Sequence, residues 1–289
     1  MAHPLTLLEV SNFRTIRGSV SLPLDASVVL IHGINNCMED WLLNIAALAR
    51  NHRVYALDLI GHGRTDKPLS NPYRPTDFAR FVKDFMDALQ IQSAHLVGHS
   101  LGGAVALMVA INYPSTVNRL VLVDSAGIAR QVSVIFKLLS IPGVGEALGT
   151  MVFQGALQKR VALQRQSWPD PKIVPDEMIR RKVLAFTWQD IRKPYYKALR
   201  ASCNILGMKK SAYLPIRQGL PNLKNPTLVI WGERDGLLPA SLAQVLKDNL
   251  PDVRVVLFEN CKHNPMVTEP QRFNRLVGDF LSGDHPNDP

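Results

Sequence analysis

One serine of the sequence stands in a setting that suits nucleophilic chemistry. Ser100 lies between Gly98 and Gly102, after a short apolar run and before a helical pattern, in the order Gly-His-Ser-Leu-Gly. A serine on a sharp strand-to-helix turn takes a strained backbone, and small residues two positions away let neighbouring backbone approach. The start of a helix also favours a developing negative charge. We therefore predict that Ser100 is a nucleophile on a strand-turn-helix elbow.

A serine hydroxyl is a weak nucleophile at neutral pH and needs a nearby base. His263 follows the last apolar run of the chain and Asp235 the run before it, so both are expected at the same sheet edge as Ser100. The imidazole would accept the serine proton, while the carboxylate would fix its tautomer and stabilise the imidazolium. Two other acids remain open, Glu233 close by and Asp124 at the end of another strand. The turn geometry favours Asp235.

Acyl transfer also needs two preorganised donors for the oxyanion. We expect these to be the backbone N–H groups of Ile34, in the loop after the first strand, and of Leu101, at the helix start. Four residues of the same two loops are candidate substrate contacts: His32, Gly33, Asn35 and His99. The two histidines among them also suit hydrogen-bonded supports of their loops. No histidine spacing indicates a metal, and we expect neither a metal nor another cofactor.

These residues need a fold that positions them, and the pattern of apolar residues predicts that fold. Six short apolar runs predict buried strands at 28–31, 53–58, 94–98, 120–124, 227–231 and 253–258. Helical patterns occur at 41–49, 76–89, 101–112, 241–250 and 270–281. Strands that alternate with helices predict an α/β fold with a mostly parallel central sheet flanked by helices. Residues 15–22 are expected to add an antiparallel edge pair.

Residues 127–220 break this alternation, because they contain helical patterns and scattered prolines but no βα unit. They separate two strands that should be neighbours, so the insertion should emerge at the carboxyl edge of the sheet, where ligands bind. We predict a helical cap over residues 127–220 and a core formed by 1–126 and 221–289.

The same segment carries the positive charge of the protein. It holds 16 Lys and Arg against 5 Asp and Glu, in a chain whose net charge is +9. This excess is either a solvated face or a surface that attracts anionic lipid or an acidic substrate. Nothing resembles a nucleic-acid-binding motif, so we expect no nucleic-acid partner.

The sequence start has no basic and apolar pattern of a secretory signal, and no apolar run approaches the roughly 20 residues of a membrane span. The three cysteines are odd in number and widely spaced, which favours free buried thiols in a reducing compartment. We therefore expect a cytoplasmic protein.

Several motifs together resemble the α/β-hydrolase superfamily over nearly the whole chain: VVLIHG (28–33), DLIGHG (58–63), GHSLGG (98–103), WGERD (231–235) and KHNP (262–265). The resemblance implies the α/β-hydrolase fold and a serine-histidine-acid triad. The subgroup that the chain resembles includes carboxylesterases, lipases, meta-cleavage C–C hydrolases and cofactor-free haloperoxidases. Epoxide hydrolases and haloalkane dehalogenases use an aspartate nucleophile, so Ser100 argues against both. Lys262 departs from the glycine usual before the histidine, and we expect it to point to solvent.

We expect the chain to cleave a small carboxylic ester through an acyl-enzyme, as carboxylesterases and lipases do. The predicted cap is rich in apolar and aromatic residues, which suits an apolar acyl group. The main alternative is hydrolysis of a C–C bond with the same triad. A cofactor-free haloperoxidase and a ligand-binding protein without turnover are less favoured.

Overall fold

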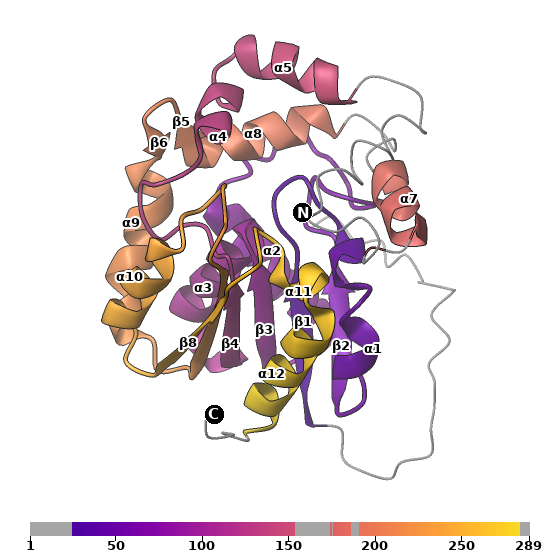
Figure 1. The fold of residues 1–289 in the computed structure, drawn as a ribbon, viewed down its shortest axis with the longest axis vertical. Coiled ribbons are helices and arrows are strands. Elements are labelled where there is room, and N and C mark those ends of the chain that lie inside the picture. The colour runs from indigo at the N-terminus through magenta and orange to yellow at the C-terminus, as the bar shows by residue number, and fades with distance from the viewer. Residues whose placement is uncertain (1–24, 154–173, 175, 186–190, 284–289) are drawn as a thin grey trace.

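The computed structural model describes residues 25–153, 174, 176–185 and 191–283, and its centre is a six-stranded sheet (Figure 1). All adjacent strands are parallel, in the order β2-β1-β3-β4-β7-β8. The strands are β1 (Asp25–Ile31), β2 (His52–Leu57), β3 (Ala94–His99), β4 (Val117–Val123), β7 (Thr227–Gly232) and β8 (Val253–Phe258). The predicted strands are therefore confirmed to within a few residues. The expected edge pair at 15–22 lies outside the described residues.

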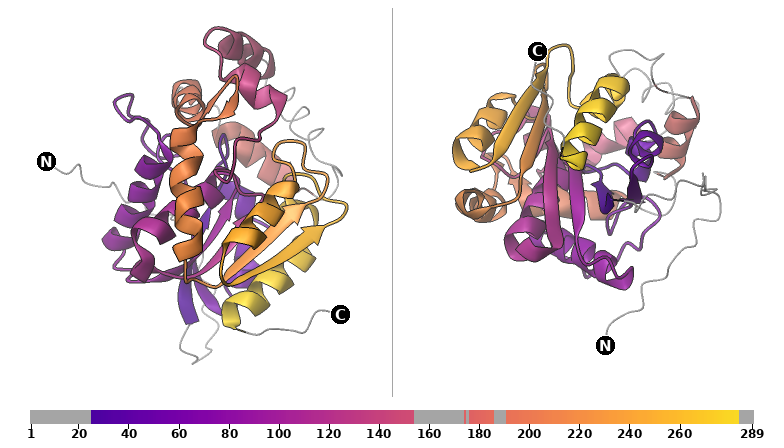
Figure 2. Two further views of the ribbon diagram at one scale, coloured as in Figure 1. Left: turned by 90° about the vertical axis from the view of Figure 1, so that its left-hand side faces the viewer. Right: turned by 90° about the horizontal axis from the view of Figure 1, so that it is seen from below.

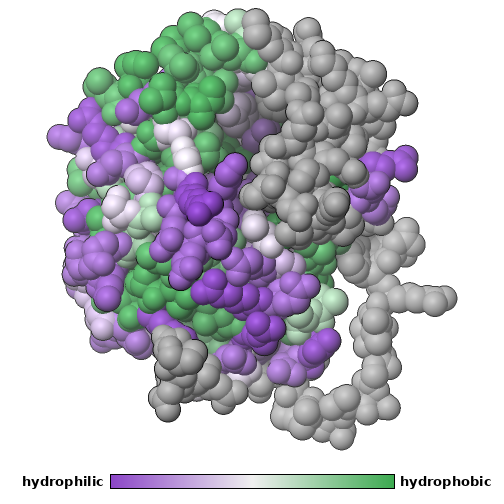
Figure 3. Space-filling view, viewed as in Figure 1, coloured by the Kyte–Doolittle hydropathy of each residue, from purple (hydrophilic) through white to green (hydrophobic). Residues whose placement is uncertain are grey.

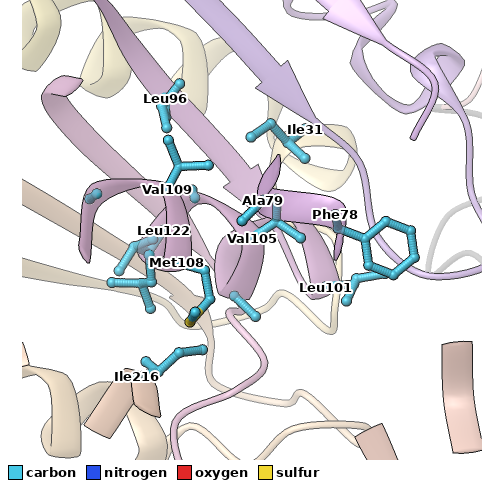
Figure 4. Packing of buried hydrophobic residues seen from close by; sticks show 14 of the residues in the cluster. Ile31, Phe78, Ala79, Leu96, Leu101, Val105, Met108, Val109, Leu122 and Ile216 are labelled. Carbon is cyan, nitrogen blue, oxygen red and sulfur yellow. The ribbon is translucent and has the colours of Figure 1, made fainter. Parts of the chain in front are cut away.

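The sheet is apolar on both faces because helices cover both. In β1, Val29 and Ile31 belong to one core cluster while Val28 and Leu30 belong to another, as the two-residue period of a strand requires. Figure 2 shows the helices on the two sides of the sheet, and Figure 4 shows the packing of the first cluster. That cluster contains α2 (Pro75–Ala88), α3 (Leu101–Asn112) and α10 (Ser241–Asn249). The second contains α11 (Pro265–Thr268) and α12 (Pro270–Ser282).

The helix predicted at 41–49 is wrong in extent. A 3-10 turn, η1 (Met38–Trp41), and a four-residue helix, α1 (Ile45–Leu48), take its place. Asn44 lies between them, and its side chain donates to the carbonyl of Met266 at 2.9 Å and to Asn274 Oδ1 at 2.8 Å. This residue therefore fixes the chain to α11 and α12, a tertiary contact that a local apolar pattern does not contain.

The segment between β4 and β7 leaves the sheet at the carboxyl end of β4 and returns to the amino end of β7, because the two strands are parallel. The two strands pair directly, so their predicted adjacency is confirmed. The intervening elements are α4 (Val134–Leu139), α5 (Val144–Phe153), α7 (Asp176–Ala185), α8 (Arg192–Ser202), β5 (Cys203–Asn204), β6 (Gly207–Met208), α9 (Lys210–Gly219) and the 3-10 turn η3 (Leu220–Asn222). In Figure 1, α4, α5 and α8 lie above the sheet, whereas α9 runs beside it and contacts α3. The division into core and cap stays a prediction.

Three properties of the chain complete the fold. Cys37, Cys203 and Cys261 are buried thiols that form no disulfide among the described residues, as expected. A second 3-10 turn, η2 (Pro114–Thr116), leads from α3 into β4. None of the helices in the described ranges is both long enough and apolar enough to cross a bilayer.

Candidate active site

Ser100 lies on a strained turn between β3 and α3. Its φ of 53° and ψ of −115° place it outside the usual regions for a residue with a side chain. A Cβ atom on Gly98 would lie 2.3 Å from the carbonyl oxygen of Gly102, and one on Gly102 would lie 2.1 Å from that of Ile31. The predicted steric reason for both glycines is therefore confirmed, because no larger residue fits either position.

Asp235 and His263 form a hydrogen-bonded pair after neighbouring strands. His263 Nδ1 lies 2.6 Å from Asp235 Oδ2, and the Asp235 side chain is fully buried. The other oxygen, Oδ1, accepts the backbone N–H groups of Leu237 at 2.7 Å and Leu238 at 3.1 Å. Three donors suit an ionised carboxylate. A proton held on Nδ1 leaves Nε2 of His263 as the basic nitrogen. Glu233, the nearby alternative, is exposed.

His99 connects the base to the serine turn. Its Nε2 donates to the backbone carbonyl of His263 at 2.7 Å, and the two rings lie 4.8 Å apart between centroids. His99 immediately precedes Ser100, so the loop that carries His263 is fixed beside that serine. Within the described part of the chain no hydrogen bond joins Ser100 Oγ to His263. Bonds between catalytic groups often shorten only when substrate binds.

Ser100 faces a narrow apolar pocket of about 40 Å³, which has room for only a few water molecules. Its lining includes both predicted oxyanion donors, Ile34 and Leu101, together with Phe136, Leu199 and Met208. Among the described residues, neither the N–H of Ile34 nor that of Leu101 donates to a backbone carbonyl. Both donors are thus available to an oxygen beside Ser100.

Residues 28–276 match the Alpha/beta hydrolase family. The chain belongs to that family. The human monoacylglycerol lipase ABHD6 is 27% identical over 91% of this chain and 77% of its own length. Two solved structures are also similar, a meta-cleavage product hydrolase from Pseudomonas fluorescens and a bacterial membrane phospholipase A. The first has a TM-score of 0.71 with 27% identity, over 89% of this chain and 91% of that one. The second has a TM-score of 0.66 with 29% identity, over 89% and 79%.

The four candidate substrate contacts of the hydrolase do not line this pocket. His32 uses both ring nitrogens, since Nδ1 donates to the carbonyl of Gly33 at 2.7 Å and Nε2 accepts the N–H of Leu59 at 2.9 Å. His32 and His99 therefore support their loops. A Cβ on Gly33 would lie 3.1 Å from that of Ser100, which explains a small residue there. Asn35 is half-buried with a φ of 57°. Direct contact of these four with substrate stays a prediction.

Asp124, the second alternative acid, lies at the same edge in the hydrolase but is not bonded to the base. It is completely buried, and its Oδ1 accepts the N–H of Gly232 at 2.8 Å. Its Oδ2 has no hydrogen-bond partner in the ranges that the structure describes. Burial, and then the charge of Asp235, raises the pKa of Asp124 well above its usual range. A raised pKa disfavours the charged carboxylate, which is the form that stabilises an imidazolium.

Asp124, His99 and His263 are also the one group of the described residues whose atoms could hold a metal ion. Their potential ligand atoms lie within 4.8 Å of one another. One nitrogen of each histidine is engaged in the bonds described above.

One smaller sequence prediction is confirmed, because Lys262 is exposed, as expected for a side chain that points to solvent. Asp58 accepts the N–H groups of Arg64 at 2.8 Å and of Met38 at 2.7 Å, so it stabilises the turn that follows β2. Beside this turn, burial and the neighbouring His32 lower the pKa of His62 to about 3. His62 is therefore neutral and structural in the hydrolase.

Sequence reasoning missed the hairpin β5–β6. Its residues Cys203 and Met208 line the pocket, with Ser202 just before it. Two-residue strands have no periodicity that could reveal them. The nearest signal is Gly207, whose φ of 108° only glycine adopts easily and whose added Cβ would lie 2.4 Å from the carbonyl of Arg130.

Proposed function

We propose that this α/β hydrolase is a serine hydrolase that cleaves carboxylic esters with an apolar acyl group, through an acyl-enzyme. The supporting observation is the pair of Asp235 and His263 beside a strained serine whose pocket contains two available backbone donors. Each member comes from the end of a different strand of one parallel sheet, the usual place for a site in such folds.

The proposed reaction begins when Ser100 Oγ attacks the ester carbonyl carbon and His263 Nε2 accepts the hydroxyl proton. Asp235 stabilises the imidazolium, and the N–H groups of Ile34 and Leu101 donate to the oxyanion. The intermediate collapses as His263 returns the proton to the departing alkoxide, which leaves as the alcohol. Water then attacks the acyl carbon as the same nitrogen takes its proton, and the bond to Ser100 Oγ breaks as His263 gives that proton back to the serine, which releases the carboxylic acid.

The pocket supports an apolar acyl group. None of its described lining residues carries a charge, and Phe136, Leu199 and Met208 surround the serine with hydrocarbon and sulfur. Such a lining removes water from an alkyl chain and strengthens the hydrogen bonds to the oxyanion. The similarity to a monoacylglycerol lipase and to a membrane phospholipase A agrees with an acyl ester as substrate.

A second candidate is hydrolysis of a C–C bond in a vinylogous diketone acid with the same triad. The similarity to the solved meta-cleavage product hydrolase favours it. Such a substrate carries carboxylates, however, and the described pocket lining offers no Lys or Arg to bind them. Turnover of a ring-cleavage dienoate without turnover of any p-nitrophenyl ester would establish this second function.

The decisive experiment is a chain-length series of p-nitrophenyl esters, with Ser100→Ala as the control. We expect turnover by the unmodified protein and a loss in kcat on the order of 10⁴ or more in the variant, because a missing triad member removes nucleophilic catalysis. A fluorophosphonate should label Ser100. Ester turnover that survives in Ser100→Ala would remove the proposal.

A further inference from the structure

An apolar surface faces outward directly above the pocket. Six of its side chains are large, hydrophobic and exposed, and we call them the outer apolar patch: Val134, Ile135, Leu138, Val144, Ile205 and Leu206. Val134 is 67% exposed and Leu206 62%. Figure 3 shows hydrophobic residues gathered at the top of the molecule, where Figure 1 places α4 and α5. Exposed hydrocarbon concentrated on neighbouring elements marks an interaction site.

The patch and the pocket share their elements. Helix α4 presents Val134 and Ile135 outward, while Phe136 of the same helix lines the pocket. The hairpin repeats this arrangement, since the turn residues Ile205 and Leu206 are exposed whereas Cys203 and Met208 of its strands face the serine. The hairpin strand β5 contacts α4. The patch and the pocket are therefore formed by different side chains of the same two elements.

The charges around the patch are positive. Arg130 is exposed and donates to the carbonyl of Leu206 at 3.1 Å, so it lies against the hairpin turn. Lys210 is exposed where α9 begins, and Lys137 lies on α4. In the part of α4, α5 and the hairpin that the structure describes, the one acid is Glu146, which pairs with Arg200 at 2.7 Å. Hydrocarbon bordered by cations complements a lipid surface with anionic headgroups.

We propose that the outer apolar patch docks on a phospholipid bilayer that carries anionic lipid, and that the hydrolase takes its acyl ester from that surface. This inference rests on the proposed ester hydrolysis and names the source of the substrate. The pocket of about 40 Å³ is too small for a long acyl chain. Insertion of the α4 and hairpin side chains among lipid tails would stabilise these elements in a position that widens it.

The test measures binding to phosphatidylcholine vesicles, with and without phosphatidylglycerol, by flotation of the full chain. We expect binding to the anionic vesicles that salt weakens. The variant V134S/I205S/L206S should bind them at least about tenfold less, since it removes three apolar side chains from the lipid contact. Lys210→Gln should weaken binding about fivefold, the effect of one charge at an anionic surface.

Leu257→Ser is the matched control, because Leu257 is 39% exposed on β8 and lies outside the patch. Its binding should equal that of the unmodified protein. Turnover of a short soluble p-nitrophenyl ester should be unchanged in all these variants, because none of the substituted residues lines the pocket, whereas turnover of a long-chain monoacylglycerol in anionic vesicles should fall with binding.

Equal vesicle binding by the triple variant and the unmodified protein would overturn the inference. So would a dimer in light scattering that the triple variant dissociates, because the patch would then contact a second copy of the chain. Soluble-ester turnover without vesicle binding would refute the docking alone. Vesicle binding without turnover of any ester would refute the proposed function instead.

Discussion

The ends of β4 and β7 each carry an aspartate at the same sheet edge, but the two have different surroundings. Asp235 accepts three hydrogen bonds, one of them from His263. Asp124 accepts one, from Gly232, and has an oxygen without a partner among the described residues. The two carboxyls therefore differ in their hydrogen-bond donors, and the donor that distinguishes Asp235 is the His263 ring.

Asp124 has its own structural role in this comparison. Its backbone N–H donates to Ile230 at 3.0 Å and its side chain accepts from Gly232, so it joins the ends of two strands. The N–H of Asp235 in turn donates to the carbonyl of Gly232 at 3.1 Å. Asp124 therefore helps to position the loop that carries Asp235.

Substitution of Asp235 should have a much larger effect on turnover than substitution of Asp124. Asp235→Asn should lower kcat on the order of 10⁴-fold, because an amide beside Nδ1 favours the wrong imidazole tautomer and leaves the imidazolium without a counter-charge. The measurement is p-nitrophenyl ester turnover per fluorophosphonate-reactive site. Glu233→Gln is the neighbouring control and should keep full activity, since Glu233 is exposed. If Asp235→Asn kept a tenth of the activity, a residue other than Asp235 would have to stabilise the imidazolium.

The next effect concerns stability. Asp124→Ala should lower the free energy of unfolding by about 1–3 kcal/mol, since it leaves the buried N–H of Gly232 without an acceptor. Asp124→Asn keeps that acceptor and should lower the free energy less. Urea unfolding of the two variants at neutral pH gives the comparison, and an equal loss in both would show that the bond to Gly232 is not the cause.

A smaller effect is expected on activity. Asp124→Asn should reduce kcat by less than about tenfold, or about 1.4 kcal/mol in barrier, because Asp124 is not bonded to His263 and the amide keeps an acceptor for Gly232. A loss as large as that of Asp235→Asn would mean that the charge of Asp124 is needed, which contradicts its raised pKa.

The pH dependence of stability tests the raised pKa of Asp124. Because the folded pKa of Asp124 is raised, its protonated form contributes stability that is complete below the unfolded pKa of about 3.9 and is lost as pH rises through the folded value. Asp124→Asn does not titrate, so its stability relative to the unmodified protein should increase with pH, by up to about 1.4 kcal/mol per unit. The measurement is urea unfolding of both proteins from pH 4 upward. A difference in their free energies of unfolding that stayed constant with pH would contradict this expectation.

Much of the fold and site could be predicted because the signals are local. Apolar runs between turns define the strands, and glycines around Ser100 report a backbone that only small neighbours permit. The sequence favoured Asp235 as the partner of His263 but left Glu233 and Asp124 open. Coordinates were needed to choose among the three acids, because the choice depends on which donors surround each carboxyl. The support of His263 by His99 joins residues 164 apart in the chain, which one sequence does not reveal.

The direct pairing of β4 with β7 has a consequence for how this chain can diversify. The chain leaves β4 at its carboxyl end and returns through α9 and η3 to the start of β7, so elements inserted before α9 need not alter the strand register. Exchanging the inserted segment for another of different shape should alter selectivity while the reactive side chains keep their places. A library of such chimaeras could be screened for new substrate selectivity while the candidate catalytic residues stay unchanged.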